Sequence, residues 1–422
     1  MVNSRKINDN ITISYIPMKK LKTTSAGVYL HRPLSRDEVS VNALLSYVLK
    51  RGCRKYPTTS DISIRCEELY GASFSSGVMK MGETQIISLS GDTISDRYAP
   101  EGEHLTSEII SLILSVLFDP LEENGAFKES YVEQEKQTLR DNINAVINDK
   151  GVYAQVRCTE IMCENEAYGI RVLGRIDDID KITARGLYEH YRKIISSSKI
   201  DIFVAGDADI DALCEDIKDY IKDFEFKPCE YPETKAAVKG GEIRNVTDHL
   251  DVTQGKLALG LRTGITPKDD NYWGLVVANS VFGSGAHSKL FNNVREKMSL
   301  AYYAASQLDK SKGVMFVNSG IEFENYEKAY AEIMRQLENV KQGIIGESEI
   351  NAAKNAIINA FNSYYDNEGY MIIYYLTERL LGTDNDIEYA KERIEKVTTE
   401  DIMEAAKEIE LDTVYFLAGK EE

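Results

Sequence analysis

The stretch KIDIFVAGDADID, residues 199–211, has a counterpart in LDTVYFLAGKEE, residues 411–422. Each is a short apolar run that finishes on Ala-Gly, a pattern typical of a buried strand bounded by a turn. Ahead of each strand the same order recurs: Arg-Ile, then acidic residues, then a threonine placed to cap an amphipathic helix. The chain therefore contains two copies of one unit of about 200 residues.

The correspondence between the two copies extends over most of each half. One predicted strand and two predicted helices recur in the same order, and the matching ranges are 85–92 with 313–320, 103–121 with 324–344, and 139–162 with 357–380. Strands and helices occur in runs rather than in strict strand–helix–strand alternation, which favours a mainly antiparallel sheet with helices on one face. We therefore predict an α+β fold of two tandem homologous domains.

The predicted domains span residues 1–225 and 243–422 of the 422-residue chain. Residues 226–242 lie between them and combine prolines, lysines and paired glycines, a composition that favours an exposed linker. Hydrophobic residues make up 43% of the chain and charged residues 28%, the balance of a globular protein.

The formal net charge of −18 argues against nucleic acid as a partner, because binding to phosphates needs a basic surface. An acidic surface aids solubility and favours basic partners or peptides. The six cysteines are scattered and form no Cys-x-x-Cys pair, which favours reduced thiols in a cytosolic protein. No stretch approaches the roughly 20 apolar residues of a membrane span, and the start lacks a signal-peptide core. We expect a cytoplasmic protein without a membrane partner.

The glycine-rich turn at Phe282–Gly285 invites a phosphate-binding interpretation, but the lysine that follows falls outside the required spacing. The preceding residues have helical length, so a turn that ends a helix is favoured. The five histidines show no metal-ligand spacing, because no two lie four residues apart or in a short local motif. We therefore expect no metal site within this chain and interpret each histidine as structural or exposed.

The stretch FGSGAHSKLFNNVREKMSLAYY, residues 282–303, resembles the C-terminal-domain signature of the pitrilysin/insulinase metallopeptidase superfamily, which includes the mitochondrial processing peptidases. That signature is a glycine-rich turn, Ser-x-Leu-Phe, Arg-Glu-Lys and Leu-x-Tyr. The resemblance covers the whole chain, since a tandem repeat is also that family's plan. It implies that each half is an α+β domain with an antiparallel sheet and that the two halves form a clamshell.

The family's zinc motif, His-x-x-Glu-His, belongs on a helix of the first half. The resemblance places the two histidines at Ala43 and Tyr47, the general base at Ser46 and a further glutamate ligand at Asn142, counting from the matching Gly52. These side chains are poor zinc ligands or none at all. The chain is therefore expected to hold no zinc and to hydrolyse no peptide alone.

The resemblance assigns a catalytic role to Arg295 and Tyr302, which keep the family's spacing and reach the substrate near the scissile bond. An arginine fork and a tyrosine hydroxyl both donate hydrogen bonds to a peptide carbonyl or oxyanion. Some bacterial members are two-chain enzymes, and the stretches KKLKTTSAGVYL, YVLKRG and EELYGA resemble the YfmF-like branch, whose partner is a zinc-bearing homologue.

Two functions follow from this resemblance. In the first, the chain is the non-zinc subunit of a heterodimeric peptidase, contributes Arg295 and Tyr302 to a partner's zinc site, and acts on peptides or short unfolded segments. In the second, the chain is a catalytically inactive structural or peptide-binding homologue, which could also form a dimer with itself. Retention of the Arg/Tyr pair favours the first function, because a scaffold has no need of it.

Overall fold

The computed structural model describes residues 2–238 and 240–420. Met1, Lys239, Glu421 and Glu422, which fall within the predicted domains and linker, lie outside the described residues. The chain packs as two compact units: unit 1 holds residues 1–144, 170–233 and 364–380, and unit 2 holds 145–169, 234–363 and 381–422. The predicted clamshell concerns the placement of these units and stays a prediction.

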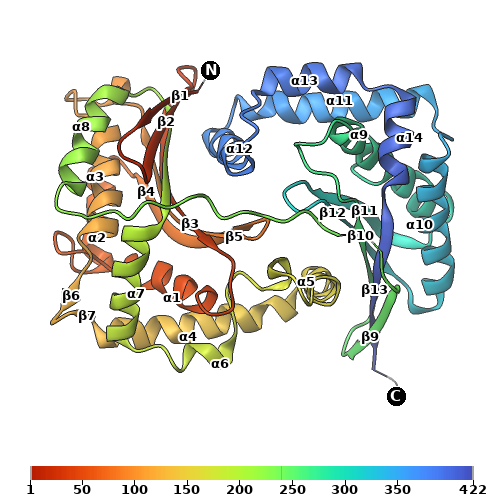
Figure 1. The fold of residues 1–422 in the computed structure, drawn as a ribbon, viewed down its shortest axis with the longest axis horizontal. Coiled ribbons are helices and arrows are strands. Elements are labelled where there is room, and N and C mark those ends of the chain that lie inside the picture. Colours follow the sequence, from red (N-terminus) through yellow and green to blue (C-terminus); the bar gives the residue numbers. More distant parts are fainter. Residues whose placement is uncertain (1, 239, 421–422) are drawn as a thin grey trace. The chain divides into compact units, whose positions relative to one another are not determined.

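Unit 1 is built on a six-stranded sheet in the order β1-β2-β8-β3-β5-β4 (Figure 1). Only the β2–β8 pair is parallel, so the sheet is mainly antiparallel. The strands of this sheet are β1 (Asn3–Lys6), β2 (Ile11–Pro17), β3 (Thr23–Pro33), β4 (Ser73–Met81), β5 (Thr84–Ile94) and β8 (Lys199–Gly206). A separate two-stranded hairpin consists of β6 (Glu122–Glu123) and β7 (Ala126–Phe127).

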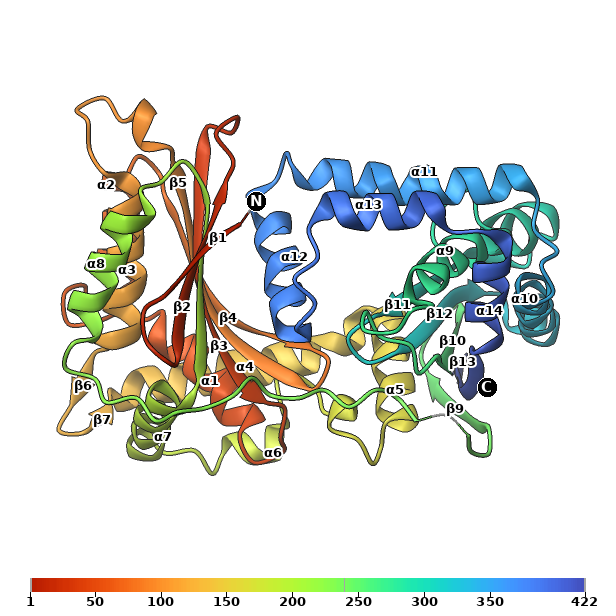
Figure 2. The ribbon, with the colours of Figure 1, turned by 45° about the horizontal axis from the view of Figure 1, so that its top comes forward.

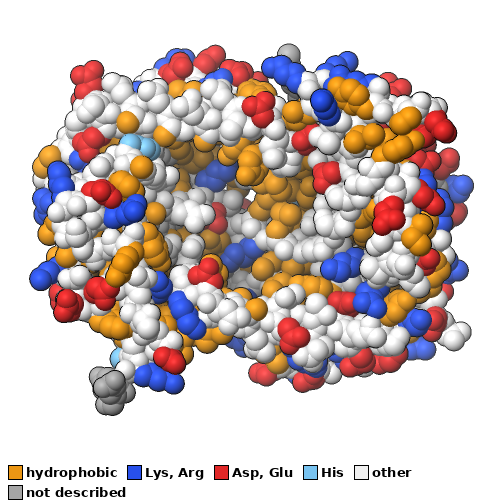
Figure 3. Space-filling model, turned by 180° about the vertical axis from the view of Figure 1, so that it is seen from behind, with side chains coloured by type: hydrophobic (Ala, Val, Ile, Leu, Met, Phe, Trp, Pro, Cys, Tyr) orange, Lys and Arg blue, Asp and Glu red, His pale blue; other side chains and the backbone are white. Residues whose placement is uncertain are grey.

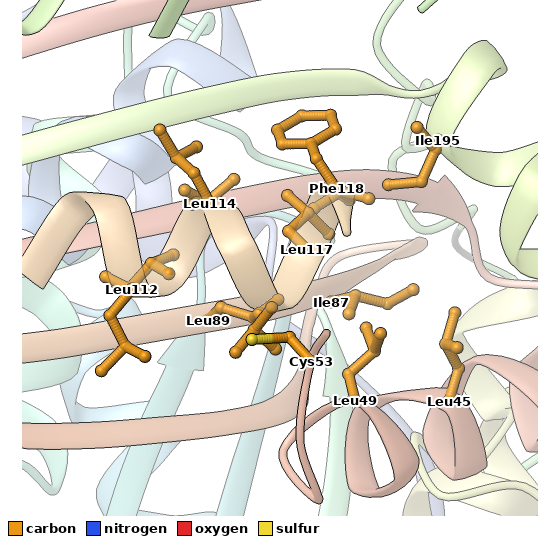
Figure 4. Close-up of a cluster of buried hydrophobic side chains, with 14 of the residues drawn as sticks. Leu45, Leu49, Cys53, Ile87, Leu89, Leu112, Leu114, Leu117, Phe118 and Ile195 are labelled. Atoms are coloured by element: carbon orange, nitrogen blue, oxygen red, sulfur yellow. The ribbon is translucent and has the colours of Figure 1, made fainter. Parts of the chain in front are cut away.

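Helices cover one face of this sheet and bury the main core of unit 1 against it. Figure 4 shows Leu45 and Leu49 of α1, Ile87 of β5 and Leu117 of α3 converging in this core. The helices of unit 1 are α1 (Val39–Leu49), α2 (Thr59–Glu68), η1 (Asp96–Tyr98), α3 (Leu105–Phe118), α4 (Glu129–Ala145), α6 (Ile176–Ile179), α7 (Ala184–Ser197), α8 (Ile210–Ile221) and α12 (Glu368–Leu381).

Unit 2 repeats this plan with a five-stranded sheet in the order β11-β12-β10-β13-β9, in which only β13–β9 is parallel. Its strands are β9 (Arg244–Leu250), β10 (Gly255–Arg262), β11 (Ala301–Asp309), β12 (Val314–Ile321) and β13 (Glu410–Gly419). Its helices are η2 (Val146–Asn148), α5 (Lys150–Met162), η3 (Ala167–Gly169), α9 (Tyr272–Phe282), η4 (Leu290–Lys297), η5 (Phe323–Asn325), α10 (Tyr326–Lys341), α11 (Glu347–Tyr364), α13 (Ile387–Lys396) and α14 (Thr399–Lys407).

The predicted α+β repeat is confirmed by the strand order itself. The order β2-β8-β3-β5-β4 in unit 1 equals β9-β13-β10-β12-β11 in unit 2, including the place of the parallel pair. The two capping threonines are Thr183, which accepts from the Gly186 backbone at the start of α7, and Thr398, which forms a capping box with Asp401 at the start of α14. The tandem repeat therefore extends to local details of sequence.

The second face of each sheet is covered by a helix that comes from the other half of the sequence. Helix α12 lies along the face of the unit 1 sheet opposite α3 and α8 (Figure 2). Its Arg379 donates to Asp201 of β8 at 2.9 Å, and Thr377 approaches Met81 of β4. In unit 2, α5 packs on β10 and β13 through an apolar cluster that includes Cys158, Met162 and Phe316. Sequence neighbours and packing neighbours therefore differ at these two helices.

The stretch predicted as a linker has no helix or strand in its described residues, yet it is held at both ends. Tyr231 donates to the buried carboxylate of Asp201 at 2.9 Å, within unit 1. The backbone N–H of Ala237 donates to the backbone carbonyl of Lys312 at 2.8 Å, within unit 2. The stretch is therefore an anchored connection, although most of its side chains remain exposed or half-buried.

The surface carries both signs of charge. Figure 3 shows Lys and Arg side chains interspersed with Asp and Glu over the face in view, without a continuous basic stripe. Among the residues that the structure describes, no helix is both long enough and apolar enough to cross a membrane.

Candidate functional site

The four positions that the resemblance assigns to the family's zinc site lie on α1 and α4. Each side chain there is buried or hydrogen-bonded to a neighbour within unit 1. Ala43 is fully buried, and the Ser46 hydroxyl donates to the Ala43 carbonyl at 2.8 Å. The Asn142 amide donates to the Tyr47 hydroxyl at 2.8 Å. The structure thus brings Tyr47 and Asn142 together, as the resemblance implies for two ligand positions. The two side chains are a phenol and an amide, however, and not a pair of metal ligands.

This set of residues does not fit zinc. A methyl group offers no ligand atom, and neither the serine hydroxyl nor the phenol is a usual ligand. The histidines lie elsewhere with partners of their own: His31 contacts Asp201, His190 contacts Asn42 and His287 contacts Ser280, at 2.9, 2.7 and 3.0 Å. Within residues 2–238 and 240–420, no group of three or more His, Cys, Asp or Glu side chains could hold a metal ion.

The glycine-rich stretch is a turn that ends α9, as predicted from its sequence. Gly283 caps the helix, and its carbonyl accepts from the Ser306 backbone of β11 at 3.0 Å. A methyl group at Gly283 would lie 2.6 Å from that same nitrogen, so only glycine allows the turn to approach the strand this closely. Gly285 has a φ of +109°, which also favours glycine. The glycines fix the turn to β11 rather than holding a phosphate.

Arg295 lies on η4, which is a π-helix of eight residues. Such helices are rare, occur mostly as single-turn bulges inside α-helices, and are frequent at functional sites. The side-chain amides of Asn292 and Asn293 donate to the backbone carbonyls of Ser288 and Lys289, at 3.0 and 2.9 Å. The Arg295 guanidinium lies over the Phe291 ring at 4.7 Å, and its side chain is 44% exposed. Glu296 is 3.6 Å away, too far for a hydrogen bond, so the fork has no hydrogen-bond partner in the described part of the chain.

Tyr302 is the extra residue of a β-bulge at the start of β11. Ala301 pairs with Ile321 and Tyr303 pairs with Gly320, so Tyr302 has no residue opposite it on β12. A bulge of this kind redirects a side chain out of the sheet's alternation. Tyr302 is 58% exposed, and its hydroxyl donates to the Glu322 carboxylate just beyond β12. This hydrogen bond raises the pKa of Tyr302 and keeps the hydroxyl protonated.

The neighbouring tyrosine has a different environment. The ring of Tyr303 packs over Gly320, where a methyl group would come within 2.5 Å, and its hydroxyl lies beside Gly151 at the start of α5. Lys256 approaches its ring at 5.6 Å. Burial raises the pKa of Tyr303, with a further contribution from Asp149. Tyr303 therefore supports the packing of α5 on the sheet, whereas Tyr302 is presented to solvent.

The segments carrying Arg295 and Tyr302 are joined by the backbone. The Leu300 amide donates to the Val294 carbonyl at 2.9 Å, which ties the end of η4 to the start of β11. Among the described strands, β11 pairs on one side only, with β12. The segments that carry the two hydrogen-bond donors are thus adjacent, and β11 is an edge strand of the kind that can accept another chain. The sequence did not single out Glu322, because only the bulge makes it the partner of Tyr302.

The comparisons with known proteins agree with this fold. A model of the family described as peptidase M16 inactive domain matches residues 181–357. A Bacillus subtilis (strain 168) protein named probable inactive metalloprotease YmfF is 38% identical over 411 residues, which cover 97% of this chain and 96% of that protein. The crystal structure of a conserved protein from Enterococcus faecalis V583 has a TM-score of 0.90 at 30% identity, covering 100% of this chain and 99% of that one.

The chain belongs to the peptidase M16 family, which is the pitrilysin/insulinase family that its motif resembles. It is a homologue of an inactive metalloprotease-like member, and the relative that it matches is named YmfF, whereas the branch predicted from the sequence is YfmF-like. A second protein of the same Bacillus subtilis strain, named uncharacterized zinc protease YmxG, is 21% identical over 237 residues, which cover 55% of this chain and 56% of that protein.

Proposed function

We propose that this chain is the non-zinc subunit of a two-chain zinc metallopeptidase and supplies Arg295 and Tyr302 to a zinc-bearing partner. The observation that carries the proposal is the presentation of these two donors: an arginine fork, on a π-helix, that has no hydrogen-bond partner among the described residues, and a tyrosine redirected by a bulge. A scaffold gains no stability from either feature, since both π-helices and bulges interrupt regular hydrogen bonding.

The chemistry of the pair suits peptide hydrolysis. The Arg295 fork and the Tyr302 hydroxyl can donate to the oxygen of the scissile carbonyl as it gains negative charge. Donors fixed in advance stabilise that charge more than the neutral carbonyl, and this difference accelerates the reaction. The zinc and the base that activates water would belong to the partner, because the aligned positions Ala43, Ser46, Tyr47 and Asn142 cannot supply them.

The substrate is a peptide or a short unfolded segment that adds as a strand to a free sheet edge. The edge strand β11 carries Tyr302 and contacts η4, which carries Arg295, and β4 is the matching edge strand of unit 1. Main-chain hydrogen bonds along such an edge provide affinity with little sequence preference. The coexistence of a relative named inactive and one named zinc protease in one Bacillus subtilis strain supports a paired enzyme. We place this pair in the cytoplasm.

The test is to mix the purified chain with its zinc-bearing homologue from the same genome and measure complex mass and peptide cleavage together. We expect cleavage only in the mixture. Arg295→Ala and Tyr302→Phe should each lower kcat about 100- to 1,000-fold, the usual effect of removing one oxyanion donor. Tyr303→Phe is the matched control, because this adjacent tyrosine packs against Gly320 and should leave kcat within about twofold.

Three results would contradict the proposal. Full activity of the mixture with Arg295→Ala would remove the catalytic role of the pair. A stable complex that cleaves no peptide would favour the alternative, a catalytically inactive structural or peptide-binding homologue. Chelator-sensitive cleavage by this chain alone would show that its metal positions had been misassigned.

A further inference from the structure

Glu322 stands at the end of β12, where its backbone is fixed by the sheet. The preceding residue, Ile321, pairs with Ala301 of β11 and with Gly255 of β10. The Glu322 carbonyl accepts from the Asn325 amide at 3.0 Å, which begins the short helix η5. Its half-buried side chain accepts the hydrogen bond of the Tyr302 hydroxyl. A rigid strand end therefore positions this carboxylate against a residue that the bulge leaves without a partner on the opposite strand.

The tyrosine needs such a contact, because little else restrains it. Its side chain is 58% exposed, and an exposed aromatic side chain otherwise samples several rotamers. Fixing a rotamer before the substrate arrives removes an entropic penalty from the reaction step. Around β11, Glu322 is the charged group that acts on Tyr302 within the described chain, whereas Lys256 and Asp149 act on Tyr303 and Arg295 lies over Phe291.

We infer that Glu322 is a positioning residue that holds the Tyr302 hydroxyl as an oriented hydrogen-bond donor beside the free edge of β11. The inference rests on the proposed function of the Arg295–Tyr302 pair and names a residue that acts through it. A tyrosine hydroxyl has one proton, so its hydrogen bond to Glu322 must break before it can donate to a substrate oxygen. A carboxylate is a stronger acceptor than a neutral carbonyl, and only an oxygen that gains charge competes with it well. Glu322 thus favours donation by the Tyr302 hydroxyl to the charged oxygen of the transition state over donation to the neutral carbonyl of the substrate.

The first experiment follows the ionisation of Tyr302 in the isolated full-length chain. The chain is labelled with 13C at the tyrosine Cζ and titrated by NMR, and Tyr302→Phe assigns the signal among the 25 tyrosines. Glu322→Gln keeps an acceptor without the charge, and Glu322→Ala removes both. We expect the pKa of Tyr302 to fall in both variants. Glu324→Gln, an exposed carboxylate two residues further on, is the control and should leave it unchanged.

The second experiment measures kcat and KM of the two-chain complex against pH. Because Tyr302 must be protonated to donate, a lower pKa moves the alkaline limb of kcat to lower pH in Glu322→Gln. At neutral pH, Glu322→Gln should keep kcat within about threefold, whereas Glu322→Ala should lower it about tenfold, because misplaced groups lose much of their effect. A merely structural role of Glu322 would not move the alkaline limb.

The outcomes separate this inference from the proposed function. If Tyr302→Phe lowers kcat but Glu322→Ala changes neither the Tyr302 titration nor kcat, the positioning role is wrong and the proposed function stands. If the titration responds to Glu322 but Tyr302→Phe leaves cleavage intact, the hydrogen bond is real and the proposed function is wrong, so Glu322 positions nothing for catalysis.

Discussion

Tyr47 and Asn142 occupy aligned ligand positions, and their 2.8 Å hydrogen bond indicates that α1 and α4 still face each other as a metal site requires. Residues 43 and 47 are one helical turn apart, on the same face of α1. We therefore interpret the absence of a zinc site as a lack of ligand atoms rather than a change of backbone. This interpretation concerns side chains only, and it can be tested by restoring them.

A quadruple variant that restores the family's zinc motif should retain one zinc ion per chain. Its substitutions are Ala43→His, Ser46→Glu, Tyr47→His and Asn142→Glu. Bound zinc should also stabilise the variant, by about 2.7 kcal/mol when its concentration is 100 times the Kd. Metal analysis after dialysis and thermal unfolding with and without zinc provide the measurement. The same variant without Asn142→Glu is the control and should bind more weakly. A folded quadruple variant that retains no zinc would show that the alignment of these positions is wrong.

At the scale of elements, the two helices that cross between the halves of the sequence are held in different ways. Helix α5 packs through apolar side chains, whereas α12 is held by a buried polar cluster centred on Asp201 of β8. His31 and Arg379 each lie 2.9 Å from its carboxylate, and Tyr231 donates to it as well. A buried carboxylate is tolerated because these groups supply charge and hydrogen bonds.

Asp201→Asn should lower the free energy of unfolding by about 3–5 kcal/mol at pH 7, because it leaves Arg379 without a charged partner. Burial alone would raise the pKa of Asp201, but the contacts from His31 and Arg379 outweigh it and hold the pKa below its ordinary value. The stabilisation is therefore complete above roughly pH 4, the region of the unfolded carboxyl, and is lost as pH falls through the lower folded value.

Denaturant titrations of both proteins between pH 7 and acidic pH measure this effect. The gap in unfolding free energy should narrow as the pH falls. Hydrogen exchange should locate the loss of protection in α12 and around Tyr231, the two segments that Asp201 holds. Leu117→Val, a modest truncation in the core on the other face of the sheet, is a control that should show no comparable pH dependence. A gap that stays constant with pH would contradict the assignment to Asp201.

The sequence predicted those features that depend on local patterns. The apolar runs predicted the strands β8 and β13, and the threonines predicted two helix caps. The helical length of the residues before the glycine-rich turn predicted that this turn ends α9. It could not predict the π-helix, which differs from an ordinary helix by hydrogen-bond register rather than by composition. Nor could it predict the bulge at Tyr302 or the contact with Glu322, since both arise from pairing between strands.

At the scale of the whole molecule, the order of the sequence and the order of packing disagree, and this has a consequence for folding. The predicted repeat divides the chain near residue 225, but unit 1 includes α12 and unit 2 includes α5. A fragment of residues 1–242 would bury Asp201 without Arg379. A fragment of residues 243–422 would expose the apolar surface of Ala258, Phe316 and Leu417 that α5 covers.

Neither fragment should therefore fold stably alone, although each contains a complete sheet. In the first fragment Asp201 keeps His31 and Tyr231 but lacks Arg379, and this loss destabilises the fragment by several kcal/mol, a large share of the roughly 5–15 kcal/mol that stabilises a typical domain. An exposed apolar patch promotes association of the second. Thermal unfolding and size-exclusion chromatography of the separate and co-expressed fragments provide the test, with the intact chain as reference.

A peptide of residues 364–381 should raise the Tm of the first fragment, and the same peptide with Arg379→Ala should not. If both fragments unfold cooperatively with the stability of the intact chain, the exchanged helices contribute little and the repeat boundary is also the folding boundary.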